Sequence, residues 1–492
     1  MKRLVTLGLG WLMTGAVVGQ TPQPVSSGRA ELELGGMASG SGQLPFWLRT
    51  NQYGFVPLQG SVGTLQGGFQ RKYRTNTDTT NRHRSRFDWG AGVYAVANVG
   101  RSSQWLLPEA YAKVRYGRVE LWAGRRRELY GIGDSTLTSG FVVWSGNSLP
   151  IPKVQLHTPE FISVGFLKHI LAFRAGYAHG WFNPPYIKGA FLHQKYLYGR
   201  FGKPHWRFKF YAGINHQVQW GGRADYLKDS PFAVDGKLPS SLQDYLSLIV
   251  GRYPKDLVNN QQTTFDGENR VGNHIGSIDY GLEWTTSQLT TLLYYQHLYE
   301  DASGLIYLNF PDGLWGLRFR NRMPRANARF QWQGAVLEWL STTNQSGPVF
   351  DQTAQYQGGD NYFNHGQYRE GWSYFGRTIG TPFLAPRADY SAAVRAYEGG
   401  GFFPNNRVNA WYLGLDADWY RIRLNARISY SRNFGTFNEP YSPRFEQVST
   451  LLSAQWPLPK LSNTVLSARF ALDRGGLYPQ QTGGFLSIKR TW

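Results

Sequence analysis

The 492-residue chain carries 52 Lys and Arg against 32 Asp and Glu, which gives a formal net charge of +20, and it has no cysteine. The lack of cysteine excludes disulfide scaffolds, thiolate metal sites and cysteine nucleophiles. Aromatic residues make up 16% of the sequence, which excludes a disordered chain and does not suit a coiled coil. The function must therefore account for a folded protein with a large excess of positive charge.

The first twenty residues have the pattern of a secretory signal peptide. Lys2 and Arg3 precede an apolar run over residues 4–18, and small residues follow it. The run is shorter than the roughly 20 apolar residues of a transmembrane helix, so a retained anchor is the weaker interpretation. We expect removal of residues 1–20. Residues 21–492 should then form one exported, still basic domain, since no linker or internal repeat divides them.

Segments in which every second residue is apolar recur along the chain. The clearest are residues 171–177, 206–214, 411–419 and 422–430, with shorter ones at 315–320 and 468–473. A period of two is typical of β-strands, and a helix would not keep these faces. Rings end several apolar faces, as at Trp411 and Trp419, and the opposite faces are charged or small. Both features favour a membrane barrel with a polar lumen over a secreted soluble sandwich.

We therefore predict an all-β protein, a transmembrane outer-membrane β-barrel of about 16–18 antiparallel strands. The alternating C-terminal segment ends on Trp492 and resembles the closing strand of bacterial barrels, although Arg490 departs from the pattern. Tight links such as residues 418–421 contrast with long polar stretches at 67–83 and 345–382, as expected for short periplasmic turns and long outer loops.

One segment has helical rather than strand periodicity. Between residues 239 and 252, Leu242, Tyr245, Leu246 and Ile249 recur at helical spacing, and Ser240 or Ser241 is available as the N-cap. We predict a short helix near one mouth of the barrel.

Catalytic motifs are missing from the sequence. Gly131 and Gly133 lack the third glycine of a dinucleotide fingerprint, and no P-loop, HExxH or GxSxG motif occurs. The ten His are scattered, and His169, His179 and His216 are expected at the wall or rim. We expect no enzyme activity, no metal and no cofactor. A hydrolase assembled across strands is the alternative, because catalytic triads are defined by geometry.

The alternation places many basic side chains opposite apolar faces. These are Lys113, Arg115, Arg174, Arg207, Lys209, Arg318, Arg320, Arg423, Arg427 and Arg469. A charge on the lipid face would cost roughly 2–4 kcal/mol at mid-bilayer, so these side chains should face the lumen. Part of them would pair with the carboxylates of Glu120, Glu283, Glu338, Asp416 and Asp418. The excess would attract carboxylate or phosphate anions. Nucleic acid fits the charge but not the compartment.

Two segments carry a family resemblance. The first reads WAGRRRE at 122–128, GIGD at 131–134, SG at 139–140, Ser145, Asn147 and PIPK at 150–153; the second reads NRVGNHIGSIDYGLEW at 269–284. With the signal peptide and the barrel pattern, they resemble the capsule assembly protein Wzi family in its Bacteroidota form, over roughly residues 30–492. The resemblance implies an outer-membrane barrel of about 18 strands with a lumen closed by helices and loops. It also implies a non-enzymatic surface lectin, without cofactor, that anchors or organises capsular or exopolysaccharide.

The basic faces of the strands and the family resemblance together suggest the candidate polysaccharide-binding residues. They are Lys113, Arg115, Arg126, Arg174, Arg207, Lys209, Arg318, Arg320, Arg423 and Arg427, with Tyr362 and Trp372 as stacking rings. Tyr362 and Trp372 belong to an aromatic loop at 359–375, which also has Phe363, Tyr368, Tyr374 and Phe375 and for which loop packing is the alternative role. Arg125, Arg126 and Arg127 are expected at a mouth, with only part of the run facing the lumen. Gly124, Arg125, Asp134 and Asn147 are more simply explained as residues that hold a turn.

The expected partners are an acidic capsular or exopolysaccharide, outer-membrane lipid and other capsule export components. An anion-selective diffusion channel of the outer membrane is the alternative function, because a basic lumen would also suit it. A TonB-dependent transporter fits less well, since the chain is short for a 22-stranded barrel with its plug.

Overall fold

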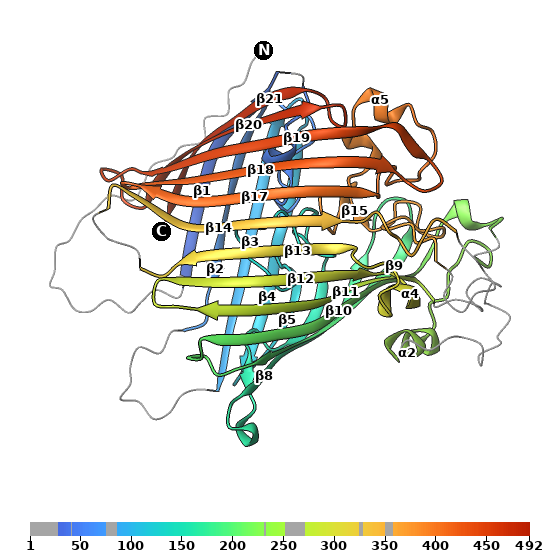
Figure 1. Ribbon diagram of the computed structural model, residues 1–492, viewed down its shortest axis with the longest axis horizontal. Helices are drawn as coiled ribbons and strands as arrows, with labels where there is room; N and C mark the ends of the chain where they lie inside the picture. The colour runs from blue at the N-terminus through green and yellow to red at the C-terminus, as the bar shows by residue number, and fades with distance from the viewer. Residues whose placement is uncertain are drawn as a thin grey trace, which may run out of the picture.

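The computed structural model describes residues 28–40, 42–74, 86–230, 233–250, 271–323, 328–349 and 358–492. The predicted signal peptide at residues 1–20 lies outside these described residues. The wall is one antiparallel sheet in which each strand pairs with its neighbours in the chain, and β1 pairs with β21 to close it. Strands β6 and β7 both pair with β8 and form one interrupted wall strand, so the barrel has 18 strands. The predicted barrel and its strand number are confirmed (Figure 1).

The wall strands are long and follow one another as a meander. They are β1 (Gly28–Ser39), β2 (Val62–Arg71), β3 (Phe87–Gly100), β4 (Gln104–Tyr116), β5 (Val119–Arg125), β6 (Lys153–His157), β7 (Ile162–Ser163), β8 (Leu171–Phe182), β9 (Lys188–Phe201), β10 (Phe208–Arg223), β11 (Asn273–Thr285), β12 (Leu289–Tyr299), β13 (Gly313–Asn321), β14 (Phe330–Ser341), β17 (Val408–Trp419), β18 (Ile422–Gly435), β19 (Pro440–Pro457), β20 (Thr464–Gly475) and β21 (Gln481–Thr491).

The α-helices are few and short in the described part of the chain. They are α1 (Phe46–Arg49), α2 (Leu242–Val250), α4 (Ala302–Leu305) and α5 (Ala392–Arg395), and a separate two-stranded sheet pairs β15 (Ser373–Tyr374) with β16 (Arg377–Thr378). Helix α2 confirms the predicted helix. Its N-cap is Ser241, whose hydroxyl accepts the Asp244 N–H at 3.1 Å while the Asp244 carboxylate accepts the Ser241 N–H at 2.8 Å. No helix of the described residues is long and apolar enough to span a membrane.

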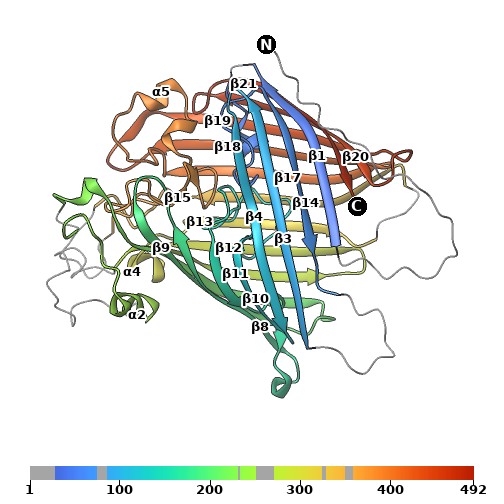
Figure 2. The same cartoon turned by 180° about the vertical axis from the view of Figure 1, so that it is seen from behind.

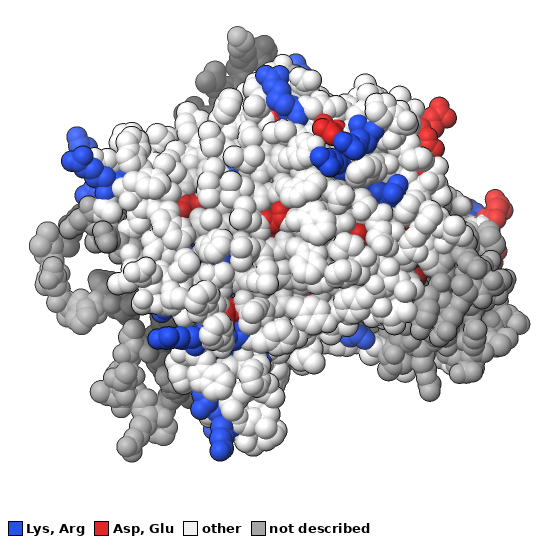
Figure 3. Space-filling view, in the orientation of Figure 1, with Lys and Arg blue, Asp and Glu red and all other residues white. Residues whose placement is uncertain are grey.

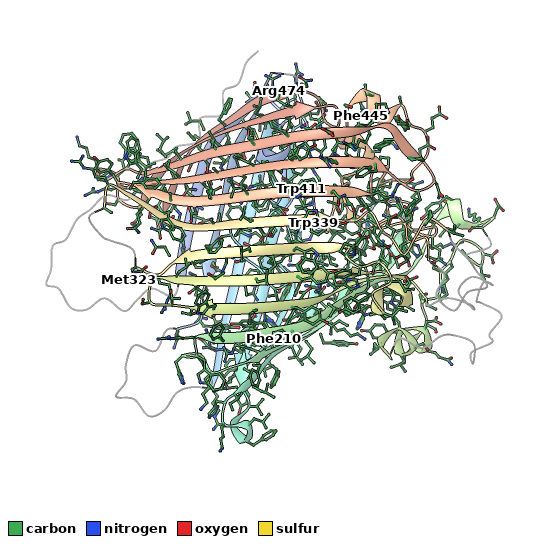
Figure 4. All side chains as sticks on the ribbon, in the orientation of Figure 1. Phe210, Met323, Trp339, Trp411, Phe445 and Arg474 are labelled. Atoms are coloured by element: carbon green, nitrogen blue, oxygen red, sulfur yellow. The ribbon has the colours of Figure 1, made fainter. Side chains whose placement is uncertain are left out.

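The outer face of the wall carries a row of rings above a row of aliphatic side chains. Trp315, Trp339, Trp411 and Tyr430 occupy one register row across β13, β14, β17 and β18. Two residues along each strand toward its short turn, the row is Leu317, Leu337, Leu413 and Ile428. Figure 4 shows Trp339 and Trp411 on neighbouring strands. Rings at one level beside an aliphatic band form the aromatic girdle predicted from the strand ends.

Tyrosine rings on the lumen face lie over glycines of the neighbouring strand. Tyr294 is the register partner of Gly316, and a Cβ on Gly316 would lie 2.0 Å from the Tyr294 Cζ. Tyr196 lies in the same way over Gly176, where a Cβ would be 2.4 Å from the ring. These close approaches require glycine, which explains part of the glycine content of the wall.

The two ends of the barrel differ in their connections. At one end the turns are tight, as at residues 117–118 between β4 and β5 and at 420–421 between β17 and β18. At the other end lie the long connections, shown at the right of Figure 1 with α2, α4 and α5. In barrels of this class the short turns are periplasmic and the long loops extracellular. The prediction for residues 418–421 is confirmed.

The two predicted long loops need correction. Residues 67–71 belong to β2 and pair with both β1 and β3, because their glycines are strand residues rather than turn residues. Residues 75–83 lie outside the described residues. The described parts of 345–382 do not extend outward as a loop, because most of their apolar side chains, with Val349 and Phe375 as exceptions, are buried.

Candidate binding vestibule in the lumen

Three long connections from the loop end fold into the lumen. They comprise residues 40–61 with α1, residues 126–152, and residues 342–407 with β15, β16 and α5; their described parts are called the plug below. Large side chains from all three, including Trp47, Trp144, Trp372 and Phe383, join the lumen-facing residues of the wall in one buried core. Burial of these rings against each other and against the wall stabilises the plug inside the barrel.

Hydrogen bonds fix the plug to strands all around the wall. The Phe46 N–H donates to Asp473 of β20 at 2.9 Å, the Ser139 N–H to Glu338 of β14 at 2.7 Å, and the Val142 N–H to Gln296 of β12 at 2.9 Å. On the other side the Tyr368 hydroxyl donates to the Gly221 carbonyl of β10 at 3.0 Å, and Asn98 of β3 donates to the Phe55 carbonyl at 2.8 Å. The plug is therefore attached to both sides of the lumen rather than to one. Figure 2 shows the opposite wall, from β1 to β5.

The aromatic loop expected to offer stacking rings is part of this plug. Tyr362 and Trp372 are fully buried. The Tyr362 hydroxyl donates to Asp312 at 3.1 Å, and the Trp372 indole N–H donates to the Val143 carbonyl at 2.9 Å. Of the six rings named above, Phe375 alone is exposed. The alternative role, loop packing, is the one that the structure supports for the other five rings, which are not available to a sugar.

Asp134 holds a turn of the plug. Its carboxylate accepts the N–H groups of Thr136 at 2.8 Å and Leu137 at 3.0 Å, and both Nε and Nη2 of Arg320 at 3.0 and 2.8 Å. Burial alone would raise the pKa of Asp134, but the hydrogen bonds from Thr136 and Arg320 hold it below its usual value. Asn147 likewise accepts the Asn51 N–H at 3.0 Å. These residues organise the plug.

The lumenal basic side chains of the wall lie on the turn side of the plug. Most of them project from the half of each strand that is nearest to its short turn, as do Arg115 on β4, Arg174 on β8, Arg318 on β13 and Arg427 on β18. The alternation argument is thus confirmed for these positions, because their strand neighbours Val114, Phe173 and Ile428 are exposed on the outer face. Arg207 differs: it precedes β10, and its side chain is exposed at the turn end.

About half of the candidate cations have a carboxylate partner, as the sequence suggested. Glu120 pairs with Lys113 at 3.6 Å and Arg126 at 2.5 Å, while Glu283 pairs with Lys209 at 2.6 Å and Arg318 at 3.5 Å. Arg320 pairs with Asp134, and Arg423 with Asp416. Glu338 was expected to pair with a cation, but it accepts hydrogen bonds from Thr138, Ser139 and Tyr294 instead, because the plug brings neutral donors to it. Asp418, also expected to pair with a cation, accepts from Gln333 at 2.6 Å.

Five lumenal arginines have no carboxylate within ion-pair distance among the described residues: Arg115, Arg174, Arg200, Arg427 and Arg469. Their guanidinium groups lie near rings instead, with Arg115 at 4.3 Å from the Tyr73 centroid and Arg469 at 5.1 Å from that of Phe485. The buried Nε atoms of Arg174, Arg200 and Arg427 have no hydrogen-bond partner in the described part of the chain. Arg200 was not identified as a lumenal cation from the sequence. The signal was present, because Tyr196, Tyr198 and Arg200 alternate with more exposed neighbours.

Two of these arginines line a hollow directly beneath the plug. It has a volume of about 230 Å³, and its lining includes Thr136, Asp416, Arg423, Arg427, Gln455 and Arg469; we call it the vestibule. Arg427 Nη2 donates to the Thr136 carbonyl of the plug at 3.2 Å, while Arg423 is 55% exposed. The vestibule can bind an anion, because three guanidinium groups face one carboxylate there. The described residues contain no cluster of His, Asp and Glu that could hold a metal ion.

Comparison with known proteins identifies one family. The family model described as capsule assembly protein Wzi matches residues 49–397. None of the curated proteins matches the chain. Among solved structures, OccAB2 of Acinetobacter baumannii has a TM-score of 0.45 at 10% identity, with 96% of this chain and 99% of that chain covered. OprD of Pseudomonas aeruginosa has a TM-score of 0.45 at 10% identity, with 95% and 94% covered.

Proposed function

Because the chain belongs to the capsule assembly protein Wzi family, whose place is the outer membrane, we propose that it binds an acidic capsular or exopolysaccharide and so anchors or organises that polymer at the cell surface. The protein acts in capsule assembly without catalysing a reaction. Its lumen supplies the charge for this binding, and the polymer supplies carboxylate or phosphate groups.

The lumenal arginines without carboxylate partners support this proposal most directly. Arg427 and Arg469 are partly exposed residues that line the vestibule, whereas Tyr362 and Trp372 are buried in the plug. Uncompensated guanidinium groups in a confined space favour carboxylate or phosphate over neutral sugars. The plug lies between the vestibule and the loop end, so we propose that the vestibule holds the part of the polymer on the turn side, which is periplasmic in this class of barrels, and that the protein organises the surface polymer from there.

Binding of purified polymer by purified protein tests the proposal. We expect wild-type protein to bind the acidic capsular polysaccharide of its own cells, and R427Q with R469Q to weaken binding at least tenfold. The control pair, R118Q with R421Q, removes the same charge from exposed turn residues and should leave binding within twofold. Raising the salt concentration should weaken wild-type binding, because the attraction is partly exposed to solvent. Equal binding by both pairs of variants would overturn the assignment of the vestibule.

A deletion experiment tests the cellular role. Without the protein, capsular polysaccharide should move from the cells into the medium, and unchanged cell-bound polymer would contradict the proposal. Conductance separates this function from the diffusion channel considered above. A plugged barrel should give no steady current in a planar bilayer, whereas an anion-selective channel would give a steady open pore.

A further inference from the structure

A second group of cations lies on the outer face of the barrel, at the loop end of three consecutive strands. It consists of Arg432 on β18, Arg444 on β19 and Arg474 on β20, and we call it the outer arginine cluster. Arg432 of β18 is the register partner of Glu446, which lies two residues from Arg444 on β19. In the adjacent row, Val448 of β19 pairs with Tyr430 of β18 on one side and with Arg474 of β20 on the other. This register places the three arginines near one another on neighbouring strands. Its position on the lipid side separates it from every lumenal cation.

The cluster has more positive charge than its neighbours can balance. Arg444 pairs with Glu446 at 3.0 Å, and Glu446 is the one carboxylate that the described residues place beside the three guanidinium groups. Arg432 Nε donates to the Tyr430 hydroxyl at 3.2 Å, and Arg474 Nη1 donates to the Gln480 side chain at 3.3 Å. Arg444 is about half exposed, so its remaining N–H groups are open to a ligand. A phosphate would satisfy several of these donors at once.

An apolar hollow lies on the wall directly beside the cluster, on the membrane side. Its volume is about 490 Å³, and its lining includes Trp315, Leu317, Leu337, Trp339, Trp411, Leu413, Ile428 and Tyr430. The Arg432 guanidinium carbon is 5.6 Å from the Trp411 ring centroid and 5.7 Å from that of Tyr430. The cations therefore adjoin the hollow at its ring-lined side.

The level of the cluster in the membrane follows from the aromatic row. Such girdles mark the interface between the hydrocarbon core and the headgroups. Arg432 lies two residues beyond Tyr430 toward the loop end, and Arg444 lies two residues beyond Glu446, the register partner of Arg432, which places both arginines at the headgroups of the outer leaflet. In Figure 3 the blue side chains lie near the two ends of the wall strands, and a group of them lies over the loop end of β18–β20. Figure 4 labels Arg474 and Trp411 on this face.

We propose that this surface binds an outer-leaflet glycolipid whose sugar headgroup is phosphorylated. The arginines hold the phosphate groups, and an acyl chain lies in the hollow among Trp339, Trp411 and Leu413. Apolar contact alone would select no particular lipid, and charge alone would accept any soluble phosphate. The juxtaposition of the two selects a lipid that presents phosphate at the outer interface. This site is independent of the proposed polysaccharide site, which lies inside the lumen.

Native mass spectrometry of the full-length protein in mild detergent tests the proposal, with diphosphoryl lipid A as the probe. We expect wild-type protein to retain this lipid and to bind dephosphorylated lipid A at least tenfold more weakly. The triple variant R432Q, R444Q and R474Q should lose at least tenfold in affinity for diphosphoryl lipid A. The control variant R118Q, R421Q and K460Q removes the same charge from exposed residues at the turn end and should bind like wild type.

Three results would overturn the proposal. They are a triple variant that binds like wild type, equal retention of phosphorylated and dephosphorylated lipid A, and equal retention of phosphatidylglycerol, which would indicate general attraction of anions. Heat-modifiable migration of each variant on gels checks that the barrel is folded. Polysaccharide binding by the triple variant should be unchanged, so failure of this site and failure of the proposed function give different results.

Discussion

The substitution Asp134→Ala should loosen the plug without affecting the wall. Asp134 belongs to the plug, and its carboxylate accepts two backbone N–H groups, those of Thr136 and Leu137, in addition to Arg320. Alanine leaves both N–H groups without this partner at the point where the segment 131–142 contacts β11–β14. The strands themselves keep all their ladder hydrogen bonds. The expected effect is therefore a more frequent local opening of this segment.

The size of the effect follows from the lost hydrogen bonds. A hydrogen bond to a charged group contributes about 1.5–3 kcal/mol, so loss of the two backbone bonds should cost about 3 kcal/mol or more. The ion pair with Arg320 adds to this cost, because the Arg320 side chain is 46% exposed but the Asp134 carboxylate that it contacts is buried. At a factor of ten for each 1.4 kcal/mol, opening of the segment should become about a hundredfold more frequent.

Single-channel recording in planar bilayers detects such openings. Wild-type protein should be silent or open rarely, whereas Asp134→Ala should give frequent transient openings. The comparison variant Arg320→Gln removes the Arg320 hydrogen bonds to Asp134 and Thr136 but keeps both backbone N–H bonds to Asp134, so it should open less often than Asp134→Ala. A folded Asp134→Ala protein that is as silent as wild type would refute the role of this carboxylate. Steady conductance of the wild type would refute the closed lumen itself.

Acid should produce a related effect in the wild type. The pKa of Asp134 is below its usual value, so its ionised form is favoured in the closed plug. The stabilisation is therefore complete above the ordinary aspartate pKa of about 3.9, and it is lost as the pH falls through the lower pKa of the folded state. In the wild type, openings should therefore become more frequent only at strongly acid pH. Asp134→Ala, which opens often at every pH, should lack this increase.

The remaining predictions concern stability, measured by thermal unfolding. Trp372→Ala should lower the free energy of unfolding by about 3–5 kcal/mol, because it leaves a cavity at a buried site and removes the hydrogen bond to the Val143 carbonyl. Phe375→Ala removes an exposed ring and should change that free energy by no more than about 0.5 kcal/mol. Equal losses in the two variants would contradict the packing role of Trp372. Burial, and then the charges of neighbouring carboxylates, raise the pKa of Asp360 to about 7, so its ionisation opposes folding as the pH rises from about 4 to 7. Asp360→Asn should therefore raise the unfolding temperature at pH 8 but not at pH 4. An equal change at both pH values would contradict this direction of the pKa shift. Gly316→Ala should prevent normal barrel assembly, since its Cβ would meet the Tyr294 ring at 2.0 Å, and a wild-type unfolding temperature would contradict the close approach.

The wall could be predicted because strand alternation is a local property. In residues 411–419 every second side chain faces lipid, and the rings at both ends mark the two interfaces, so the sequence alone indicates the direction of each side chain. The same alternation assigned Arg174, Arg318 and Arg427 to the lumen. It also placed Arg207 in the lumen, but Arg207 lies beyond the end of its strand, where alternation no longer determines exposure.

The plug could not be predicted in the same way. Tyr362 and Trp372 lie in a glycine-rich, polar stretch without periodicity, and such a stretch is typical of an exposed loop. Their burial depends on contacts with residues far away in the sequence, such as the bond from Trp372 to Val143. The vestibule also depends on contacts between residues far apart in the sequence. Arg427 and Arg469 line one hollow together with Thr136 of the plug.

The two proposed sites place positive charge on opposite faces of the barrel wall. Arg427 and Arg469 face the lumen on the turn side of the plug, and Arg432 and Arg444 face lipid at the loop end. Substitutions at well-separated sites without shared partners have additive effects. Combining R427Q and R469Q with R432Q, R444Q and R474Q should therefore reduce affinity for the polysaccharide and for diphosphoryl lipid A by the same factors as each set alone. A larger loss for either ligand in the combined variant would show that the two surfaces are coupled through the wall of β18–β20.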